Sequence, residues 1–226
     1  MFDRIAHRYD LLNHGLSAGQ DWRWRAHLAQ QLQAVPHGDV LDLATGTADQ
    51  LLALARRCPG LQRGLGVDLS LGMLQRGQPK LPVEPGRPHL LLVHGDAQHL
   101  PLRSASVAAV TISFGIRNVA DIRAGLAEMY RVLRPGGHLF ILEFGLPGSR
   151  LARQLYLLYF RHVLPRLGAI LSGDSHAYRY LNQTVETFPY GEAFCAQLRA
   201  AGFTTVDAMA MTMGVVYLYR GQRPTS

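Results

Sequence analysis

The sequence predicts an α/β fold in which helices cover both faces of a mostly parallel, seven-stranded sheet. Three observations predict it. Apolar, strand-like runs alternate with helical patterns between residues 38 and 145. Two further strand-like runs close the chain, and 226 residues that are 48% hydrophobic can bury a full core. Strict alternation of strands and helices indicates parallel strands joined by right-handed crossovers.

The expected elements follow in order along the chain. Strand-like runs lie at residues 40–43, 64–68, 90–93, 108–113 and 138–144, and helical patterns lie between them at 49–57, 72–77 and 121–133. Arg134-Pro135-Gly136-Gly137 ends the third helix and supplies the turn into the next strand. A helix at 192–201 and strands at 204–211 and 215–220 finish the chain, and this final hairpin implies an antiparallel edge strand.

Composition restricts the partners. The net charge of +7 suits nucleic acid or an anionic membrane surface, although a solvated, arginine-rich surface explains it at least equally well. The basic residues are spread along the chain without a basic block, a zinc motif or an RNA-binding aromatic signature, so we expect no nucleic-acid partner. Cys58 and Cys195 are too few for a disulfide scaffold or a metal cluster. With no signal-peptide pattern at the N-terminus, they indicate a cytoplasmic protein.

The first strand and the turn after it, residues 42–49 (Asp-Leu-Ala-Thr-Gly-Thr-Ala-Asp), are typical of the start of a nucleoside-cofactor site. Asp42 and Gly46 are candidates there. Asp68 ends the second strand, 26 residues after Asp42, where a carboxylate can accept hydrogen bonds from both ribose hydroxyls. An alternative for Asp68 is a helix N-cap, for which Ser70 is better suited. Asp96, after the third strand, can hold an adenine edge.

The chemistry of this turn favours one cofactor over another. NAD requires three glycines, so that a helix N-terminus can approach a pyrophosphate. Here Ala44 and Ala48 replace two of them, and the acid Asp49 repels phosphate. S-adenosylmethionine carries a sulfonium and an ammonium, so an acid at the start of the helix favours it over NAD.

Five sequence blocks carry a resemblance to a known family. They are residues 42–49, 66–74, 95–97, 113–119 (Ser-Phe-Gly-Ile-Arg-Asn-Val) and 128–137 (Glu-Met-Tyr-Arg-Val-Leu-Arg-Pro-Gly-Gly), with outlying matches at 8–13, 178–181 and 188–189. Together they resemble the quinone C-methyltransferases of menaquinone and ubiquinone biosynthesis, over nearly the whole chain. The resemblance implies a Class I, Rossmann-like, S-adenosylmethionine-dependent methyltransferase fold. It also implies cofactor contacts at Thr47, Asp68, Asp96, Ala97 and Ser113.

Two residues depart from the family pattern. Ala48 stands where many members have glycine, and its methyl group narrows the approach of the backbone to the cofactor if it faces the site. Ala108 stands where members usually carry an aspartate. Loss of that aspartate changes little if it only orders the strand, and lowers cofactor affinity if it shapes the pocket.

Methylation of an aromatic carbon requires an electron-rich ring, such as that of a reduced quinol, and a protein that stabilises the phenolate. We assign this stabilisation to Arg117, because arginine stays protonated, and the orientation of a quinol oxygen to Asn118. Pairing of Arg117 with a surface carboxylate is the alternative. Tyr9 is a candidate for closing over the methionine end of the cofactor, or for a buried packing residue.

The general base is not defined by the sequence. A polar cluster of Asp174, His176 and Tyr178 and the N-terminal His7 are candidates, and a histidine is the natural proton acceptor near neutral pH. A surface or helix-capping role explains His176 equally well.

We expect a single domain over residues 1–226. Its parts are an N-terminal helical extension (1–37), a cofactor-binding core (38–145), a lid insertion that receives the substrate (146–190), and a C-terminal helix and strands (191–226). The apolar run at 151–171 is too interrupted by charge to span a bilayer. It suits a lid that accepts an isoprenoid tail and touches the inner face of the membrane transiently. A packed core helix or a homodimer contact is the alternative.

The expected function is methylation of a polyprenylated quinol, demethylmenaquinol to menaquinol. Two alternative substrates are the benzoquinol of ubiquinone synthesis and another lipid-like acceptor. The non-enzyme alternative is a non-catalytic, cofactor-binding subunit.

Overall fold

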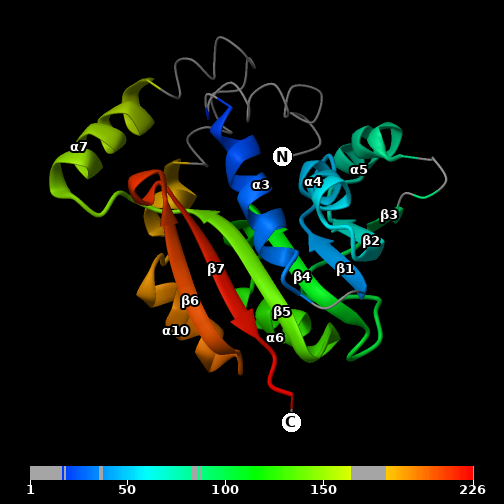
Figure 1. Cartoon of the computed structure of the whole chain (residues 1–226). Coiled ribbons are helices and arrows are strands. Elements are labelled where there is room, and N and C mark those ends of the chain that lie inside the picture. The colour runs from blue at the N-terminus through cyan, green and yellow to red at the C-terminus, as the bar shows by residue number, and fades with distance from the viewer. Residues whose placement is uncertain are drawn as a thin grey trace.

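The computed structural model describes residues 17, 19–35, 38–82, 86, 88–163 and 182–225. Seven strands form one sheet in the order β3-β2-β1-β4-β5-β7-β6 (Figure 1). The strands are β1 (Gly38–Leu43), β2 (Leu61–Asp68), β3 (His89–His94), β4 (Val107–Ser113), β5 (Leu133–Phe144), β6 (Thr204–Met211) and β7 (Val216–Gln222). The predicted seven-stranded, mostly parallel sheet is therefore confirmed.

Helices cover both faces of the sheet, as Figure 1 shows. The α-helices are α3 (Gln20–Leu32), α4 (Asp49–Arg57), α5 (Leu71–Gly77), α6 (Ile122–Val132), α7 (Arg150–Leu158) and α10 (Glu192–Ala200). Successive strand residues point to opposite faces. Val40 packs with α3 and α4 in one hydrophobic cluster, whereas Leu41 packs with α6 and α10 in the other. Cys58 and Cys195 are both buried and unbridged.

The last strand of the chain is antiparallel, as predicted, but it does not lie at the edge of the sheet, where the sequence analysis expected it. β7 is antiparallel to both β5 and β6 and lies between them. The edge strand β6 therefore runs in the same direction as β5. Burial explains the order, because β7 has four buried residues among seven and β6 has none among eight.

The sequence predicted a separate turn at the Arg-Pro-Gly-Gly segment, but the structure includes this segment in a strand. β5 begins at Leu133, directly after α6. Leu133 pairs with Val107 and His138 with Ala109, so the residues between them are accommodated as a bulge against β4. A bulge admits proline because the ladder hydrogen bonds are already interrupted there. Gly136 supplies the left-handed conformation, with φ of 77°.

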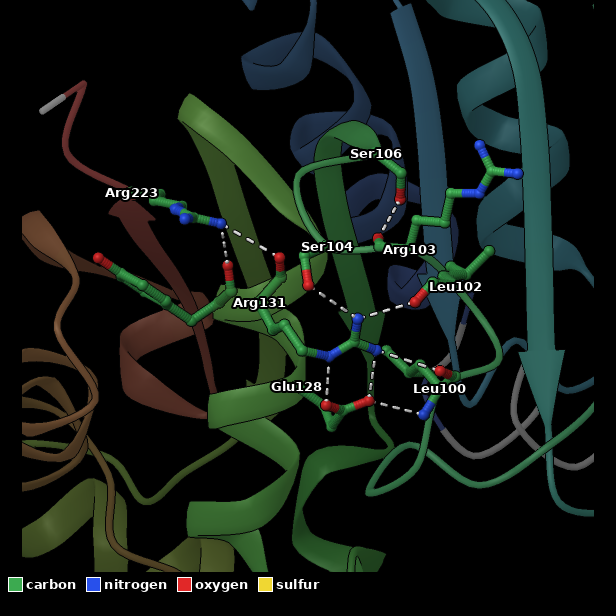
Figure 2. Close-up of polar contacts among 9 residues, drawn as sticks. Leu100, Leu102, Arg103, Ser104, Ser106, Glu128, Arg131 and Arg223 are labelled. Atoms are coloured by element: carbon green, nitrogen blue, oxygen red, sulfur yellow. Dashed lines mark hydrogen bonds and ion pairs between the residues drawn. The ribbon is translucent and has the colours of Figure 1, made fainter.

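Arg131 of α6 ties the connection between β3 and β4 to the body of the protein (Figure 2). Its Nε and Nη2 donate to the two carboxylate oxygens of Glu128, at 2.6 and 2.8 Å. Its Nη1 donates to the carbonyl of Leu102 at 2.8 Å, and Nη2 donates to the carbonyl of Leu100 at 3.1 Å. Glu128 in turn accepts from the backbone N–H of Leu100 at 2.7 Å. The Glu-Met-Tyr-Arg block thus fixes the loop that follows the third strand.

The segment after β5 carries α7 outward from the body of the protein (Figure 1). Phe160, which follows α7, packs with Leu146 and Val185 in a small cluster of its own, against Tyr156. Leu151, Leu155 and Leu158 of the same helix are exposed. Among the residues described, no helix is both long enough and apolar enough to cross a membrane.

Replacement of Arg131 tests the anchoring of this loop. We expect Arg131→Ala to lower the free energy of unfolding by about 2 kcal/mol, because several charge-assisted hydrogen bonds are lost together. Urea unfolding measures this change. Arg123→Ala, at an exposed position of the same helix, is the control and should have little effect. Equal stabilities of the two variants would show that the Arg131 network contributes nothing.

Candidate functional site

The turn after β1 has a left-handed backbone at three alternate residues. The φ angles are 46° at Ala44, 57° at Gly46 and 69° at Ala48. Only glycine adopts this region without steric cost. The chain therefore follows the path of a three-glycine turn with one glycine, and it bears strain at two alanines.

Asp68 holds this turn in place from the end of β2. Its Oδ2 accepts from the backbone N–H of Gly46 at 2.8 Å, and its Oδ1 accepts from the N–H of Ser70 at 2.7 Å. A carboxylate oxygen has two lone pairs. Because both oxygens lie at the carboxyl end of β2, this carboxylate is placed to accept from the two hydroxyls of a ribose.

A cavity of about 290 Å³ opens beside Asp68 at the carboxyl ends of the strands. Its wall includes five of the predicted cofactor residues together with the predicted quinol-binding Asn118. The lining residues with the clearest roles are Gly46, Asp68, Asp96, Ala97, Ser113 and Asn118. The cavity lies at the switch point between β1 and β4, where the strand order reverses.

Asp96 is prepared to act as a hydrogen-bond acceptor in this wall. Its Oδ1 accepts from the backbone N–H of Gln98 at 2.9 Å, and this bond holds the pKa of the carboxyl below its usual range. The carboxylate is partly exposed. It stays ionised at neutral pH and can accept from an exocyclic amine of adenine.

Asp42 lies beneath the cavity and does not line it. It is 1% exposed, and its two oxygens accept from the hydroxyls of Thr45 and Thr111, both at 2.6 Å. Burial raises the pKa of Asp42 to about 6. The carboxylate therefore supports the turn from inside, and direct contact of Asp42 with the cofactor stays a prediction.

Thr47 and Ser113 border a second, smaller cavity that adjoins the first. Thr47 is buried, and Ser113 donates from Oγ to Oε1 of Gln50 at 3.1 Å. Arg25 of α3 also lines this smaller cavity. The sequence analysis missed Gln50 and Arg25. The available signal was a polar residue directly before the apolar Leu51 and Leu52 in α4.

Arg117 does not line the larger cavity, although the next residue, Asn118, does, and Arg117 forms a buried ion pair. Its Nη1 donates to Glu143 at 2.5 Å and to the carbonyl of Phe114 at 2.7 Å. The side chain of Glu143 is fully buried and that of Arg117 is 9% exposed. Within the described part of the chain, Nε of Arg117 and Oδ1 of the neighbouring Asn118 are buried without a hydrogen-bond partner. The partner of Arg117 is thus a buried carboxylate that the sequence analysis did not name.

Phe114 lies between Ser113, which lines both cavities, and the segment that contains Arg117. Its φ of 60° is unusual for an aromatic residue, and such strain often marks a functional site. Its ring lies 4.6 Å from that of Phe144, and the Arg117 guanidinium lies 5.3 Å from the Phe144 ring. Burial raises the pKa of the Tyr156 phenol in α7, and the positive charge of Arg117 lowers this pKa by a smaller amount.

The remaining predicted residues fall outside the described part of the chain. They are Tyr9, His176 and the other candidates for the base, His7, Asp174 and Tyr178. Their roles stay predictions.

Neither of the two departures from the family pattern lines either cavity. Ala48 is fully buried and packs in the core beside α4. Ala108 is at the start of β4, whereas Ser113, which lines the cavity, is at its end. The Ala48 methyl group therefore does not narrow the larger cavity, and Ala108 does not shape it.

The residues present fit S-adenosylmethionine. Gly115 packs so closely that a Cβ there would lie 2.4 Å from Cβ of Ala44, which keeps the two loops in contact at the cavity. Asp68 provides the ribose acceptors, Asp96 an adenine acceptor, and the smaller cavity holds unpaired donors. When bound, this cofactor supplies an activated methyl group.

The fold and this cavity define a Class I, S-adenosylmethionine-dependent methyltransferase. A Thermotoga maritima protein, described as an S-adenosylmethionine-dependent methyltransferase and possible histamine N-methyltransferase, aligns with a TM-score of 0.67 at 19% identity, over 98% of this chain and 97% of its own. A Haloferax volcanii putative methyltransferase complex with the Trm112 activator gives the same TM-score at 20% identity, over 94% and 96%. These likenesses show the shared fold.

The chain belongs to the ubiE/COQ5 methyltransferase family, which it matches over residues 1–223. A "Ubiquinone/menaquinone biosynthesis C-methyltransferase UbiE" from Syntrophotalea carbinolica is 45% identical, over 99% of this chain and 92% of its own. A "Demethylmenaquinone methyltransferase" from Deinococcus radiodurans is 44% identical over 99% and 91%. One of the same name from Thermus thermophilus is 43% identical over 99% and 100%. The predicted family and cofactor are confirmed.

Two substitutions test separately how the Asp68 carboxylate and the strained backbone at Ala48 affect cofactor binding. Asp68→Ala removes the acceptor for both the ribose and the turn, so we expect binding of S-adenosylhomocysteine to be lost in calorimetry. Ala48→Gly should leave this affinity unchanged. Its effect on stability should also be small, because relief of about 1–2 kcal/mol of left-handed strain is offset by about 0.5–1 kcal/mol of glycine entropy and about 0.8 kcal/mol of lost methyl burial. A large gain in affinity in Ala48→Gly would contradict the position of that methyl group.

Proposed function

We propose that this protein methylates a ring carbon of a polyprenylated quinol, converting demethylmenaquinol to menaquinol. The observation that carries the proposal is the Arg117–Asn118 segment. Among the described residues it has an unpaired buried donor, Nε of Arg117, and an unpaired buried acceptor, Oδ1 of Asn118, and Asn118 lines the cofactor cavity. Two of the relatives are named for demethylmenaquinone, which supports this acceptor.

The residues on the acceptor side match the needs of carbon methylation. Partial loss of a phenolic proton moves negative charge to the ortho carbon. That carbon would form a bond to the activated methyl group in line with the breaking S–CH3 bond, and loss of the proton on the same carbon would then restore the aromatic ring. A protonated guanidinium stabilises that charge, and a low-dielectric site strengthens the effect. In our proposal Nε of Arg117 serves the phenolate and Oδ1 of Asn118 accepts from a quinol hydroxyl.

Glu143 gives Arg117 a fixed orientation in this scheme. The carboxylate holds Nη1 and also accepts from the backbone N–H of Phe144 at 2.8 Å. Because only Nη1 has hydrogen-bond partners among the described residues, the other guanidinium donors remain for the substrate. A fixed donor costs no reorganisation when the charge develops.

Methyl transfer from labelled S-adenosylmethionine to reduced acceptors tests the function. We expect transfer to a demethylated naphthoquinol with an isoprenoid tail. Preference for the benzoquinol would assign the ubiquinone reaction instead. Absence of transfer to both, with intact cofactor binding, would refute the proposal in favour of another acceptor or a non-catalytic subunit.

Substitutions at Arg117 and Asn118 test their roles. We expect Arg117→Lys and Asn118→Ala each to lower turnover roughly 100-fold, as for the removal of a donor that stabilises charge. Binding of S-adenosylhomocysteine should be retained. Lysine is preferred to alanine because it leaves a cation opposite the buried Glu143. Arg123→Ala should leave turnover unchanged, and full turnover in Arg117→Lys would refute the role of the guanidinium fork.

We further propose that α7 is a lid whose outer face contacts an anionic membrane surface. Leu151, Leu155 and Leu158 are 69%, 60% and 59% exposed and lie at i, i+4 and i+7, on one side of the helix. Tyr156, on the same helix, packs toward the body of the protein. A substrate with an isoprenoid tail resides in the membrane, so an apolar stripe beside the acceptor side suits its delivery.

Flotation with anionic liposomes tests the membrane contact. We expect salt-sensitive binding of the wild-type protein and its loss when Leu151, Leu155 and Leu158 are all changed to Asn. Leu91→Asn, at an exposed leucine of β3, is the control and should bind as the wild type does. Concentration-dependent self-association that is abolished by the triple change, without liposome binding, would show instead that the stripe is a homodimer contact.

A further inference from the structure

Arg25 of α3 and Gln50 of α4 face a small cavity next to the larger one. Its lining consists of Arg25, Asp42, Ala44, Thr45, Gly46, Thr47, Asp49, Gln50 and Ser113. Ala44, Gly46 and Ser113 also line the larger cavity, so the two spaces adjoin. A ligand that extends from Asp68 across Gly46 therefore reaches Arg25 and Gln50.

The guanidinium of Arg25 is buried without a polar partner. The residue is 8% exposed, and its Nε has no hydrogen-bond partner. Within the described ranges, its guanidinium forms no hydrogen bond or ion pair and lies 5.4 Å from the centre of the Phe114 ring. A buried donor that is left unpaired destabilises the folded protein. This arrangement is therefore incomplete as a purely structural contact.

Gln50 presents a second unpaired donor to the same space. The residue is 1% exposed, and its Oε1 accepts from Oγ of Ser113 at 3.1 Å. This bond fixes the side-chain amide, and its Nε2 is left without a partner among the residues described. Two unpaired donors, one of them cationic, thus line one cavity.

Among the described residues, Asp42 forms no hydrogen bond or ion pair with Arg25. The positive charge of Arg25 lowers the pKa of Asp42, although burial raises it more strongly. The two oxygens of Asp42 instead accept from Thr45 and Thr111. Asp49 on the other side of the cavity pairs with Lys80 at 3.0 Å.

We propose that Arg25 and Gln50 bind the carboxylate of the methionine moiety of the cofactor. A guanidinium and an amide N–H are the donors that carboxylates prefer. The carboxylates of Asp42 and Asp49 line the same cavity and suit the neighbouring ammonium, so this space matches a zwitterion. The inference rests on the cofactor of the proposed function and is independent of the acceptor.

Calorimetry with two ligands tests this subsite. S-adenosylmethionine and decarboxylated S-adenosylmethionine differ only in the carboxylate. We expect Arg25→Gln to weaken binding of S-adenosylmethionine roughly tenfold to a hundredfold, as for the loss of a charge-assisted hydrogen bond, and to leave the decarboxylated ligand unchanged. Arg23→Gln, at an exposed position of the same helix, should change neither. An equal loss for both ligands, or no loss, would overturn the proposal.

A second variant keeps the test valid if Arg25→Gln does not fold. Gln50→Glu places a negative charge against the ligand carboxylate, so it should weaken S-adenosylmethionine more than the decarboxylated ligand. Equal effects on the two ligands would again overturn the assignment. Neither measurement involves a quinol, so failure of the proposed acceptor leaves these outcomes unchanged.

Discussion

The left-handed turn after β1, held by Asp68, is the constraint on which the site depends. Because the backbone turns back at Ala44, Gly46 and Ala48, the loop lies flat across the ends of the strands. It then meets Gly115 of the β4 loop so closely that no side chain fits between them. One carboxylate thereby joins the ends of two strands and places the amide of Gly46 at the cavity. Asp68, Asp96 and Asn118 line one cavity as a result.

Much of this arrangement could be predicted from the sequence, because parallel strands bring their carboxyl ends to one edge. Asp68, Asp96 and Ser113 lie at three such ends, and the structure brings them together in one cavity. The missing glycines, in contrast, did not predict the conformation of this turn. Ala44 and Ala48 adopt the conformation of glycine, so their identities do not reveal the path of the backbone. The electrostatic argument against NAD rests on Asp49, which Lys80 partly neutralises.

Other features could not be predicted, because they depend on pairs that are distant in the chain. In the sequence, Glu143 is a single acidic residue in an apolar strand. Only the fold places it against Arg117. The same holds for Arg25 and Gln50, on two helices that meet across one face of the sheet. The position of β7 between β5 and β6 follows from a difference in burial that local patterns in two similar strands do not show.

The Glu128–Arg131 anchor has a consequence for how relatives of this protein are recognised. The block that contains it is among the most distinctive in the sequence, yet its side chains bind backbone carbonyls and an amide of the loop after β3. Neither Glu128 nor Arg131 lines the larger cavity. Such a signature records the ancestry of a scaffold, and enzymes that modify different rings can carry it unaltered. Substrate preference has to be sought in the residues proposed to hold the acceptor, Arg117 and Asn118, and in the proposed lid, α7.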